Sequence, residues 1–322
     1  MQYAALGAAR VEVSRLCLGT MNLGSRATPE ESHAILDTAL EAGINYVDTA
    51  NTYGSPGRPG IAESIIGDWF ARGGDRRERT VLATKLFEPT ADWPNHGGLS
   101  ALNIRRACDA SLLRLQTDHI DVLQMHHIDR AARWDEIWEA FDVLRRQGKI
   151  IYAGSSNFAG WNLAVAQGAA RDRGNLGLVS EQSVYNLAQR TVELEVLPAA
   201  EHLGIGVVAW SPLAGGLLAG TPTGHQGRRT DPGETVRRDQ HRGQIDATAD
   251  IAGDLGTTTA QLALAWLLTR PAVVAPVVGP RTVEQLCGLL PAIDLVLSSD
   301  VLAALDRVWP GPGGQAPEAY AW

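Results

Sequence analysis

Short apolar runs alternate with longer helix-patterned segments from one end of this chain to the other, and this alternation constrains its fold most strongly. The apolar runs are too hydrophobic on both sides to face water, which is typical of parallel strands covered by helices. Strands are predicted over 15–18, 45–48, 80–84, 119–125, 149–154, 177–180, 205–210 and 273–277. Helices are predicted between them over 29–42, 61–71, 99–115, 133–146, 159–171, 191–202, 257–269 and 282–290.

Eight β–α units in one chain predict an α/β fold of the (β/α)8 TIM-barrel type, with a doubly wound open sheet as the alternative. No linker divides the chain, so we expect one domain over residues 1–322. An additional C-terminal helix is predicted at about 299–309. The segments 86–98 and 211–247 show no helix or strand pattern, and we expect long loops at the C-terminal mouth of the barrel there.

The formal net charge of −8 argues against a nucleic-acid-binding protein and against a protein of membrane surfaces, because both depend on basic patches. No apolar stretch reaches the roughly 18 residues of a membrane span, and the first residues lack a signal-peptide pattern. Three scattered cysteines, Cys17, Cys108 and Cys287, indicate reduced core thiols rather than a disulfide framework. We therefore expect a cytoplasmic protein.

Four polar residues lie at or just after the ends of three consecutive predicted strands. They are Asp48 and Tyr53 after the second strand, Lys85 after the third and His126 after the fourth. In a barrel of this type the functional residues lie at the C-terminal ends of the strands. We therefore expect these four side chains to meet at one mouth of the barrel.

This set of side chains has a specific chemical use. An ammonium group near Tyr53 favours tyrosinate and is expected to lower the pKa of that phenol, while pairing with Asp48 keeps Lys85 charged. A tyrosine tuned in this way can protonate the oxygen of a carbonyl group as it is reduced. His126 can donate a hydrogen bond to the same oxygen and orient the substrate.

Each of these residues also has a structural interpretation. Taken alone, Asp48 could cap a turn and Tyr53 could be a surface aromatic residue. Lys85 is harder to explain in this way, because a lysine at the end of an apolar strand is rarely buried without a partner. The chain has only two lysines, Lys85 and Lys149, and Lys149 is interpreted as structural. His126 and His127 should point to opposite faces, so we expect no metal site.

The segments NYVDTANTYG, VLATK and DVLQMH together resemble the signature of the aldo-keto reductase family. The resemblance continues through GSSNF, EQSVYN, WSPLAGGLL and GPRTVEQL, in the expected order over residues 10–309. It implies a (β/α)8 barrel, NADP(H) as hydride donor, and Asp48, Tyr53, Lys85 and His126 as the catalytic tetrad. Within the family, the chain is similar to bacterial members like potassium-channel β subunits and to ketosugar reductases of deoxysugar pathways.

The resemblance also implies a series of cofactor contacts. Ser156, Asn157 and Gln182 match the positions that hold the nicotinamide carboxamide, and Trp210 matches the ring that stacks on the nicotinamide. The loop that contacts the pyrophosphate is matched by Ser211, Pro212, Leu213 and Gly215. The region that reads the 2′-phosphate is matched by Gly279, Arg281 and Gln285. The first loop that touches the cofactor, together with the tetrad aspartate, is matched by Gly19, Thr20, Met21 and Asp48. The chain departs from the family at Gly288-Leu289, where many relatives have a Glu-Asn pair at the adenine.

The walls of the substrate pocket are predicted from the loops that relatives use for substrate: Phe87, Trp93, His127 and Trp322. Arginines also crowd the segment 211–247, at Arg228, Arg229, Arg237, Arg238 and Arg242. This segment is interpreted either as a solvated flexible lid or as a clamp on the cofactor or on an anionic substrate.

The expected function is NADP(H)-dependent reduction of an aldehyde or ketone to an alcohol. The motifs HHIDR, SSNFAGW and APEAYAW favour a keto-sugar or a nucleotide-linked deoxysugar as substrate. The alternatives are an NADPH-binding regulatory module with little turnover, similar to channel β subunits, and a non-redox barrel isomerase or lyase. A small-molecule partner is expected, without nucleic acid or membrane; the oligomeric state stays open.

Overall fold

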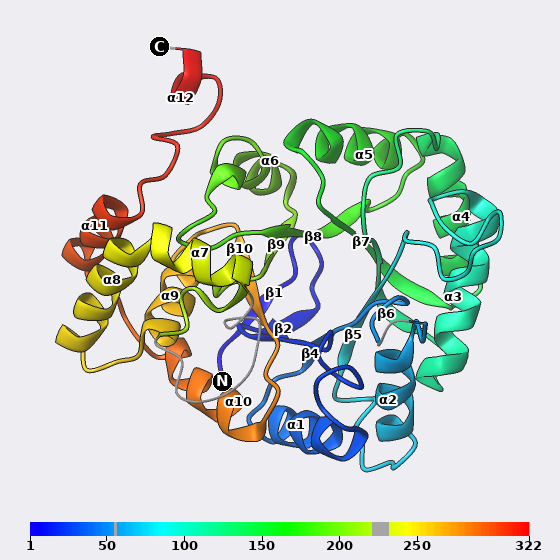
Figure 1. Cartoon of the computed structure of the whole chain (residues 1–322). Helices are drawn as coiled ribbons and strands as arrows, with labels where there is room; N and C mark the ends of the chain where they lie inside the picture. The colour runs from blue at the N-terminus through cyan, green and yellow to red at the C-terminus, as the bar shows by residue number, and fades with distance from the viewer. Residues whose placement is uncertain (55–56, 221–231, 322) are drawn as a thin grey trace.

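The structure, a computed structural model, describes residues 1–54, 57–220 and 232–321. Eight parallel strands close into a barrel in the order β10-β3-β4-β5-β6-β7-β8-β9. Figure 1 views this barrel along its axis, with a ring of helices outside it. The prediction of a (β/α)8 barrel is therefore confirmed, and the open doubly wound sheet is excluded because the first and last barrel strands, β3 and β10, pair with each other.

All eight predicted strands overlap a barrel strand. They are β3 (Cys17–Gly19), β4 (Tyr46–Asp48), β5 (Val81–Leu86), β6 (Ile120–Met125), β7 (Ile150–Ser156), β8 (Leu178–Val184), β9 (Gly206–Trp210) and β10 (Val273–Val278). The helices that overlap the predicted ones are α1 (Pro29–Glu41), α2 (Ile61–Phe70), α3 (Ala101–Leu115), α4 (Trp134–Arg146), α5 (Gly160–Asp172), α6 (Val196–Leu203), α9 (Thr259–Leu268) and α10 (Val283–Leu289).

The start of α1 shows how local sequence fixes these boundaries. The Thr28 side chain accepts a hydrogen bond from the Glu31 amide at 3.2 Å, and the Glu31 carboxylate accepts one from the Thr28 amide at 2.8 Å. Pro29 occupies the first helical position, where a missing N–H costs nothing. The helix therefore begins where its sequence provides partners for the free amides of the first turn.

An N-terminal hairpin that the sequence did not predict covers the base of the barrel. It consists of β1 (Tyr3–Ala5) and β2 (Glu12–Ser14), which pair antiparallel. Leu6 and Val13 are fully buried and pack with residues of the barrel interior such as Tyr46. The closed base leaves the opposite end, where the C-terminal ends of the strands lie, as the end open to ligands.

The prediction of an irregular segment over 211–247 is wrong for its second half. Helix α7 (Pro232–Gln240) and the start of α8 (Arg242–Asp254) lie there. Helix α8 buries Ile245, Thr248 and Ala252, a stripe that arginines and glycines obscure in the sequence. Arg228 and Arg229 lie outside the described residues.

Three further expectations are settled by the packing. The predicted helix 191–202 is split into the short turn η1 (Thr191–Glu193) and α6. The additional C-terminal helix is confirmed as α11 (Ser299–Val308), followed by a tail with α12 (Glu318–Ala321). All three cysteines are free, but the prediction of core thiols holds only for Cys17 and Cys108, because Cys287 is exposed on α10. No helix of the described chain is both long and apolar enough to cross a bilayer.

Candidate active site

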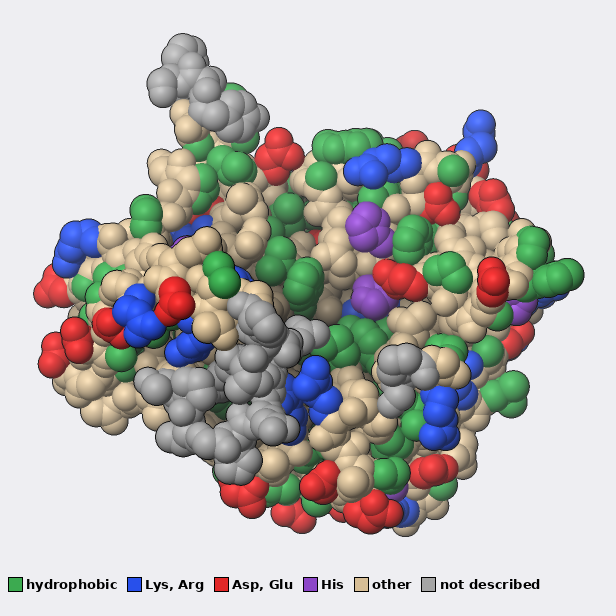
Figure 2. Space-filling model, viewed as in Figure 1, with side chains coloured by type: hydrophobic (Ala, Val, Ile, Leu, Met, Phe, Trp, Pro, Cys, Tyr) green, Lys and Arg blue, Asp and Glu red, His purple; other side chains and the backbone are tan. Residues whose placement is uncertain are grey.

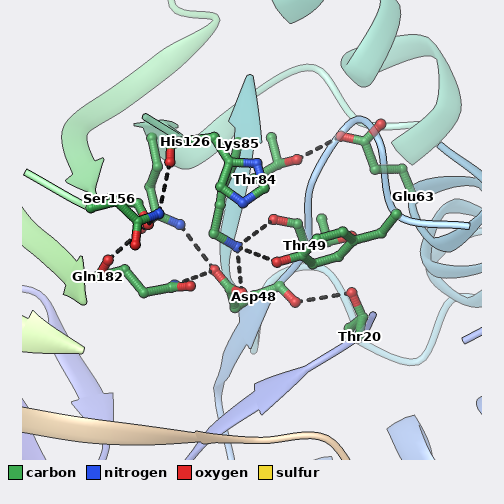
Figure 3. Close-up of polar contacts among 12 residues, drawn as sticks. Thr20, Asp48, Thr49, Glu63, Thr84, Lys85, His126, Ser156 and Gln182 are labelled. Carbon is green, nitrogen blue, oxygen red and sulfur yellow. Dashed lines mark hydrogen bonds and ion pairs between the residues drawn. The ribbon is translucent and has the colours of Figure 1, made fainter. Parts of the chain in front are cut away.

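The carboxylate of Asp48, the last residue of β4, lies at the centre of the mouth (Figure 3). Its Oδ2 accepts from Lys85 Nζ at 2.6 Å, and its Oδ1 accepts from the side-chain amides of Gln124 and Gln182 at 2.9 and 2.8 Å. These donors come from β5, β6 and β8. A buried carboxylate with three donors is held in one orientation.

Lys85 is fully buried and makes three contacts through Nζ. Besides Asp48, Nζ donates to the Thr49 carbonyl at 3.0 Å and to Tyr53 Oη at 3.3 Å. Burial alone would lower the pKa of Lys85, but the Asp48 carboxylate and Tyr53 outweigh it and the net shift is upward. Lys85 therefore remains an ammonium group beside the phenol, as the sequence predicted.

Tyr53 follows β4 and lies with its ring against this ammonium group, at 4.9 Å from Nζ to the ring centroid. Burial raises the pKa of Tyr53 above the ordinary phenol value and outweighs the lowering by Lys85. The expectation of a lowered pKa is therefore wrong in the structure as it stands. The apolar surroundings penalise tyrosinate more than one ammonium group at 3.3 Å favours it.

His126 completes the group of four. Its ring meets the Tyr53 ring edge-on, with centroids 5.9 Å apart. Its Nδ1 lies 3.0 Å from the Oε2 atom of Glu88, a residue in the loop after β5. This contact with His126 lowers the pKa of the Glu88 carboxyl below its ordinary value. The structure thus brings all four predicted side chains together and adds a carboxylate on the outer side of the histidine.

The turn after β7 joins His126 to the next part of the rim. Asn157 has a left-handed φ of 59°. Its Nδ2 donates to the His126 carbonyl at 3.1 Å and to Ser156 Oγ at 3.0 Å, while its Oδ1 accepts from Trp210 Nε1 at 3.0 Å. The Ser156 hydroxyl in turn donates to the Gln182 carbonyl at 2.7 Å. Residues predicted to hold the carboxamide and the nicotinamide ring therefore form one connected group beside the tetrad.

Glu181 lies behind this turn, with its side chain fully buried on β8. Its Oε1 accepts from the Phe158 amide at 3.1 Å and from Ser183 Oγ at 2.7 Å, and its Oε2 accepts from Ser155 Oγ. Burial raises the pKa of Glu181 to about 7, against the lowering by these hydrogen bonds. The carboxyl group fixes the start of the segment that presents Asn157.

The loop after β9 is the region predicted to contact pyrophosphate. The chain passes through left-handed φ values at Ser211, Ala214 and Gly215, which bend the backbone sharply at the rim. Arginines of α7 reach this loop: Arg237 donates to the Ala214 carbonyl at 3.2 Å and Arg238 to the Gly216 carbonyl at 3.4 Å. In Figure 1, α7 lies in front of this end of the barrel. Of the predicted loop residues, Pro212 is buried, whereas Leu213 is partly exposed.

The remaining predicted cofactor residues lie where β3 and β10 end side by side. Gly279 accepts from Asn22 Nδ2 at 2.7 Å, and the Arg281 amide donates to Gln285 Oε1 at 2.9 Å. The first-loop residues lie at the end of the adjacent strand β3, with Gly19 and Thr20 buried and Met21 exposed. A Cβ on Gly19 would lie 2.5 Å from the Val277 side chain, so the close strand pairing requires glycine there. Gly288 is exposed and Leu289 partly so.

The residues predicted to line the substrate pocket lie in different environments. Phe87 packs against His127 with ring centroids 5.5 Å apart, and both follow strands of the tetrad. Trp93 is 73% exposed in the loop after β5. Trp322 lies outside the described residues. Figure 2 shows histidine and acidic side chains close together on the mouth face.

Sequence reasoning missed Gln124, Glu88 and Glu181. Gln124 carried a usable signal, because it is a polar residue two positions before His126 in an apolar strand and so shares its face. Glu181 lies beside Gln182 in the EQSVYN segment, but nothing in the surrounding sequence distinguishes it from an ordinary strand residue. Glu88 had no signal, since its contact with His126 joins two loops whose paths the sequence does not define.

Two observations show that the residues at the mouth of the barrel are suited to bind a nicotinamide cofactor. Trp210 keeps 36% of its surface exposed while its Nε1 is held by Asn157, so a flat aromatic face is fixed at the mouth. The amide and hydroxyl groups of Ser156, Asn157 and Gln182 lie together next to Asp48 and can recognise a carboxamide.

Comparisons with known proteins agree with this geometry. The sequence profile of the Aldo/keto reductase family matches residues 15–310. The chain is 52% identical to the uncharacterized oxidoreductase YrpG of Bacillus subtilis, over all of both chains. It is 30% identical to norsolorinic acid reductase B of Aspergillus parasiticus, covering 98% of this chain and 91% of that protein. It is 32% identical to a probable voltage-gated potassium channel subunit beta of Arabidopsis thaliana, covering 99% and 100%.

Proposed function

Because this chain belongs to the aldo/keto reductase family, we propose that it reduces an aldehyde or ketone to an alcohol with NADP(H). The observation that carries the proposal is the continuous contact from Asp48 through Lys85 to Tyr53, with His126 beside the phenol at the open end of the barrel. An acid, its charged partner and a second hydrogen-bond donor converge there, as carbonyl reduction requires.

When bound, the dihydronicotinamide supplies a hydride for the carbonyl carbon. The residues of this chain handle the oxygen. Tyr53 Oη gives its proton to the oxygen as negative charge develops there, and His126 orients the same oxygen. The Lys85 ammonium, 3.3 Å from Oη, stabilises the tyrosinate that remains, and Asp48 holds that ammonium in place. Solvent at the mouth then returns a proton to Tyr53.

The raised pKa of Tyr53 has a consequence for this mechanism. A phenol with a raised pKa stays protonated throughout the neutral range, so the acid is present whenever substrate binds. The same shift makes Tyr53 a weaker acid, so the transfer depends on additional positive charge or donors around the oxygen. His126 is the group of the tetrad placed to provide them.

The first experiment follows NADPH absorbance in the presence of a panel of aldehydes and ketones. The wild-type protein is expected to oxidise NADPH with at least one class of carbonyl compound. The Tyr53→Phe variant should lose about a hundredfold or more in kcat, the usual contribution of a general acid, while cofactor binding followed by tryptophan fluorescence persists. Equal rates in the two proteins would remove Tyr53 from the mechanism.

The choice of NADP(H) over NAD(H) is part of the proposal. Its support is Arg281, just after β10, whose backbone amide is held by Gln285 of α10; a guanidinium group at this position can meet a 2′-phosphate. The Arg281→Ala variant should raise the KM for NADPH by about tenfold and leave the KM for NADH within about twofold. Equal changes for both cofactors would argue against this assignment.

A keto-sugar or nucleotide-linked deoxysugar stays a prediction for the substrate, supported by the sequence motifs alone. Turnover of simple aldehydes without turnover of a nucleotide-linked ketohexose would count against it. The second candidate function is a regulatory module that binds NADPH with little turnover. It draws support from the relative named as a channel β subunit, and bound NADPH without oxidation across the carbonyl panel would favour it.

The setting of this activity is proposed as well. We expect a single domain over residues 1–322 in the cytoplasm that acts on a small-molecule carbonyl compound. The free state of all three cysteines agrees with a reducing compartment.

A further inference from the structure

The contact between Glu88 and His126 is a feature of the mouth that the tetrad mechanism does not use. Glu88 Oε2 lies 3.0 Å from Nδ1, and the side chains are 48% and 17% exposed. Nδ1 itself is buried, and no described residue, Glu88 included, meets the geometry of a hydrogen bond at this atom, so Glu88 Oε2 faces it as an ion-pair partner. Nε2 does not share this burial, so it is the ring nitrogen left for a substrate at the mouth.

The protonation of one imidazole nitrogen is set by the partner of the other. A carboxylate can only accept, so the short distance to Glu88 Oε2 favours a proton on Nδ1. A neutral His126 with its proton on Nδ1 presents a lone pair at Nε2. Such a ring repels a carbonyl oxygen instead of donating to it. Only the doubly protonated ring satisfies Glu88 and donates from Nε2 at the same time.

We propose that Glu88 fixes the neutral form of His126 as the Nδ1–H tautomer, so that carbonyl reduction uses the imidazolium form of His126. Glu88 is thus a positioning residue that acts through His126. This inference rests on the proposed function and deepens it, because it names the protonation state in which the site works.

An imidazolium at His126 would also compensate for the weak acidity of Tyr53. Burial raises the pKa of Tyr53, so the phenol alone is a weak acid. A positively charged donor at the same oxygen gives a shorter and stronger hydrogen bond than a neutral one. The carbonyl oxygen then meets the phenol and a cation together.

Other titratable groups surround the ring from several elements. Tyr53 and Asp48 come from β4 and its loop, Lys85 from β5, and His127 follows His126 directly. Asp48 and Lys85 pair with each other at 2.6 Å, and the lowered pKa of Glu88 reflects His126 first and His127 last. Among these groups Glu88 is the one in ion-pair contact with the ring.

The direct test is nitrogen-15 NMR of the histidine rings at alkaline pH, with the His126 signals assigned from a His126→Asn variant. The wild-type ring is expected to show the Nδ1–H tautomer, and the Glu88→Gln ring should shift toward Nε2–H. The Asp92→Asn variant removes the same charge from the same loop and should leave the tautomer unchanged. A wild-type ring in the Nε2–H form overturns the proposal, whatever the protein reduces.

The kinetic test measures kcat for carbonyl reduction against pH. In the wild type, kcat should fall by about tenfold or more as His126 loses its Nε2 proton, the usual contribution of one charge-assisted hydrogen bond at a mostly buried side chain. In Glu88→Gln the fall should be less than about threefold, because the neutral ring can then keep Nε2–H. Identical profiles would overturn the proposal. Loss of all dependence on Tyr53 would instead refute the proposed function.

Discussion

The Asp48 carboxylate and the Lys85 ammonium lie 2.6 Å apart inside the barrel, and both side chains are almost completely buried. A pair of this kind cannot lose one member without leaving an unpaired charge in the interior. The same contact therefore supports both the fold and the acid at Tyr53.

Replacing Lys85 with methionine should lower the free energy of unfolding by about 3–5 kcal/mol, because Asp48 stays buried without its cation. It should also abolish measurable carbonyl reduction. Urea unfolding and the NADPH assay check the two effects. The control is Lys149→Met, since the Lys149–Asp109 pair is half-exposed and should be worth less than about 1 kcal/mol. Equal losses in the two variants would contradict this explanation.

Replacing Gln124 with methionine removes one of the two amides on Asp48 Oδ1 and keeps the side-chain volume. Stability should fall by about 1.5–3 kcal/mol, the value of one hydrogen bond to a charged group. We expect a loss of about tenfold in kcat with little change in cofactor KM, because Gln124 touches Asp48 rather than the rim. A change confined to KM would place Gln124 at the cofactor instead.

Glu181 should make stability depend on pH. Its folded pKa of about 7 lies above the ordinary glutamate value of 4.5, so the folded state binds this proton more tightly than the unfolded state. Stability from this group is therefore full below about pH 4.5 and is lost as the pH rises to about 7. The Glu181→Gln variant should gain up to about 3 kcal/mol relative to wild type between pH 5 and pH 8, measured by denaturant unfolding. A constant difference across that range would refute the assignment.

Trp210 should contribute to cofactor binding through its ring face and through its bond to Asn157. The Trp210→Ala variant is expected to raise the KM for NADPH by about tenfold, the loss of one aromatic stacking contact. Trp210→Phe keeps a ring but loses Nε1, so its KM should change by less than about threefold. If both variants behave alike, the hydrogen bond to Asn157 rather than the stacking surface holds the cofactor.

The sequence alone determined the barrel and the meeting of its four tetrad residues. Buried parallel strands appear in the sequence as apolar runs separated by amphipathic helices. This pattern can be recognised without the structure because the composition of each run alone indicates a strand. Once the strands lie in order around a barrel, their C-terminal ends share one mouth. Asp48, Lys85 and His126 therefore converge whatever the loops do.

Only the tertiary structure decided how these groups are tuned and what supports them. The shift of the Tyr53 pKa depends on burial against the distance to Lys85, and neither quantity is written in the order of residues. The contact of Glu88 with His126 depends on the paths of two loops. Helix α8 is stabilised by packing against α9 and α11, and the N-terminal hairpin by the base of the barrel that it covers, rather than by strong local patterns. The local sequence pattern thus determines the strands, whereas long-range packing determines which charged groups surround Tyr53.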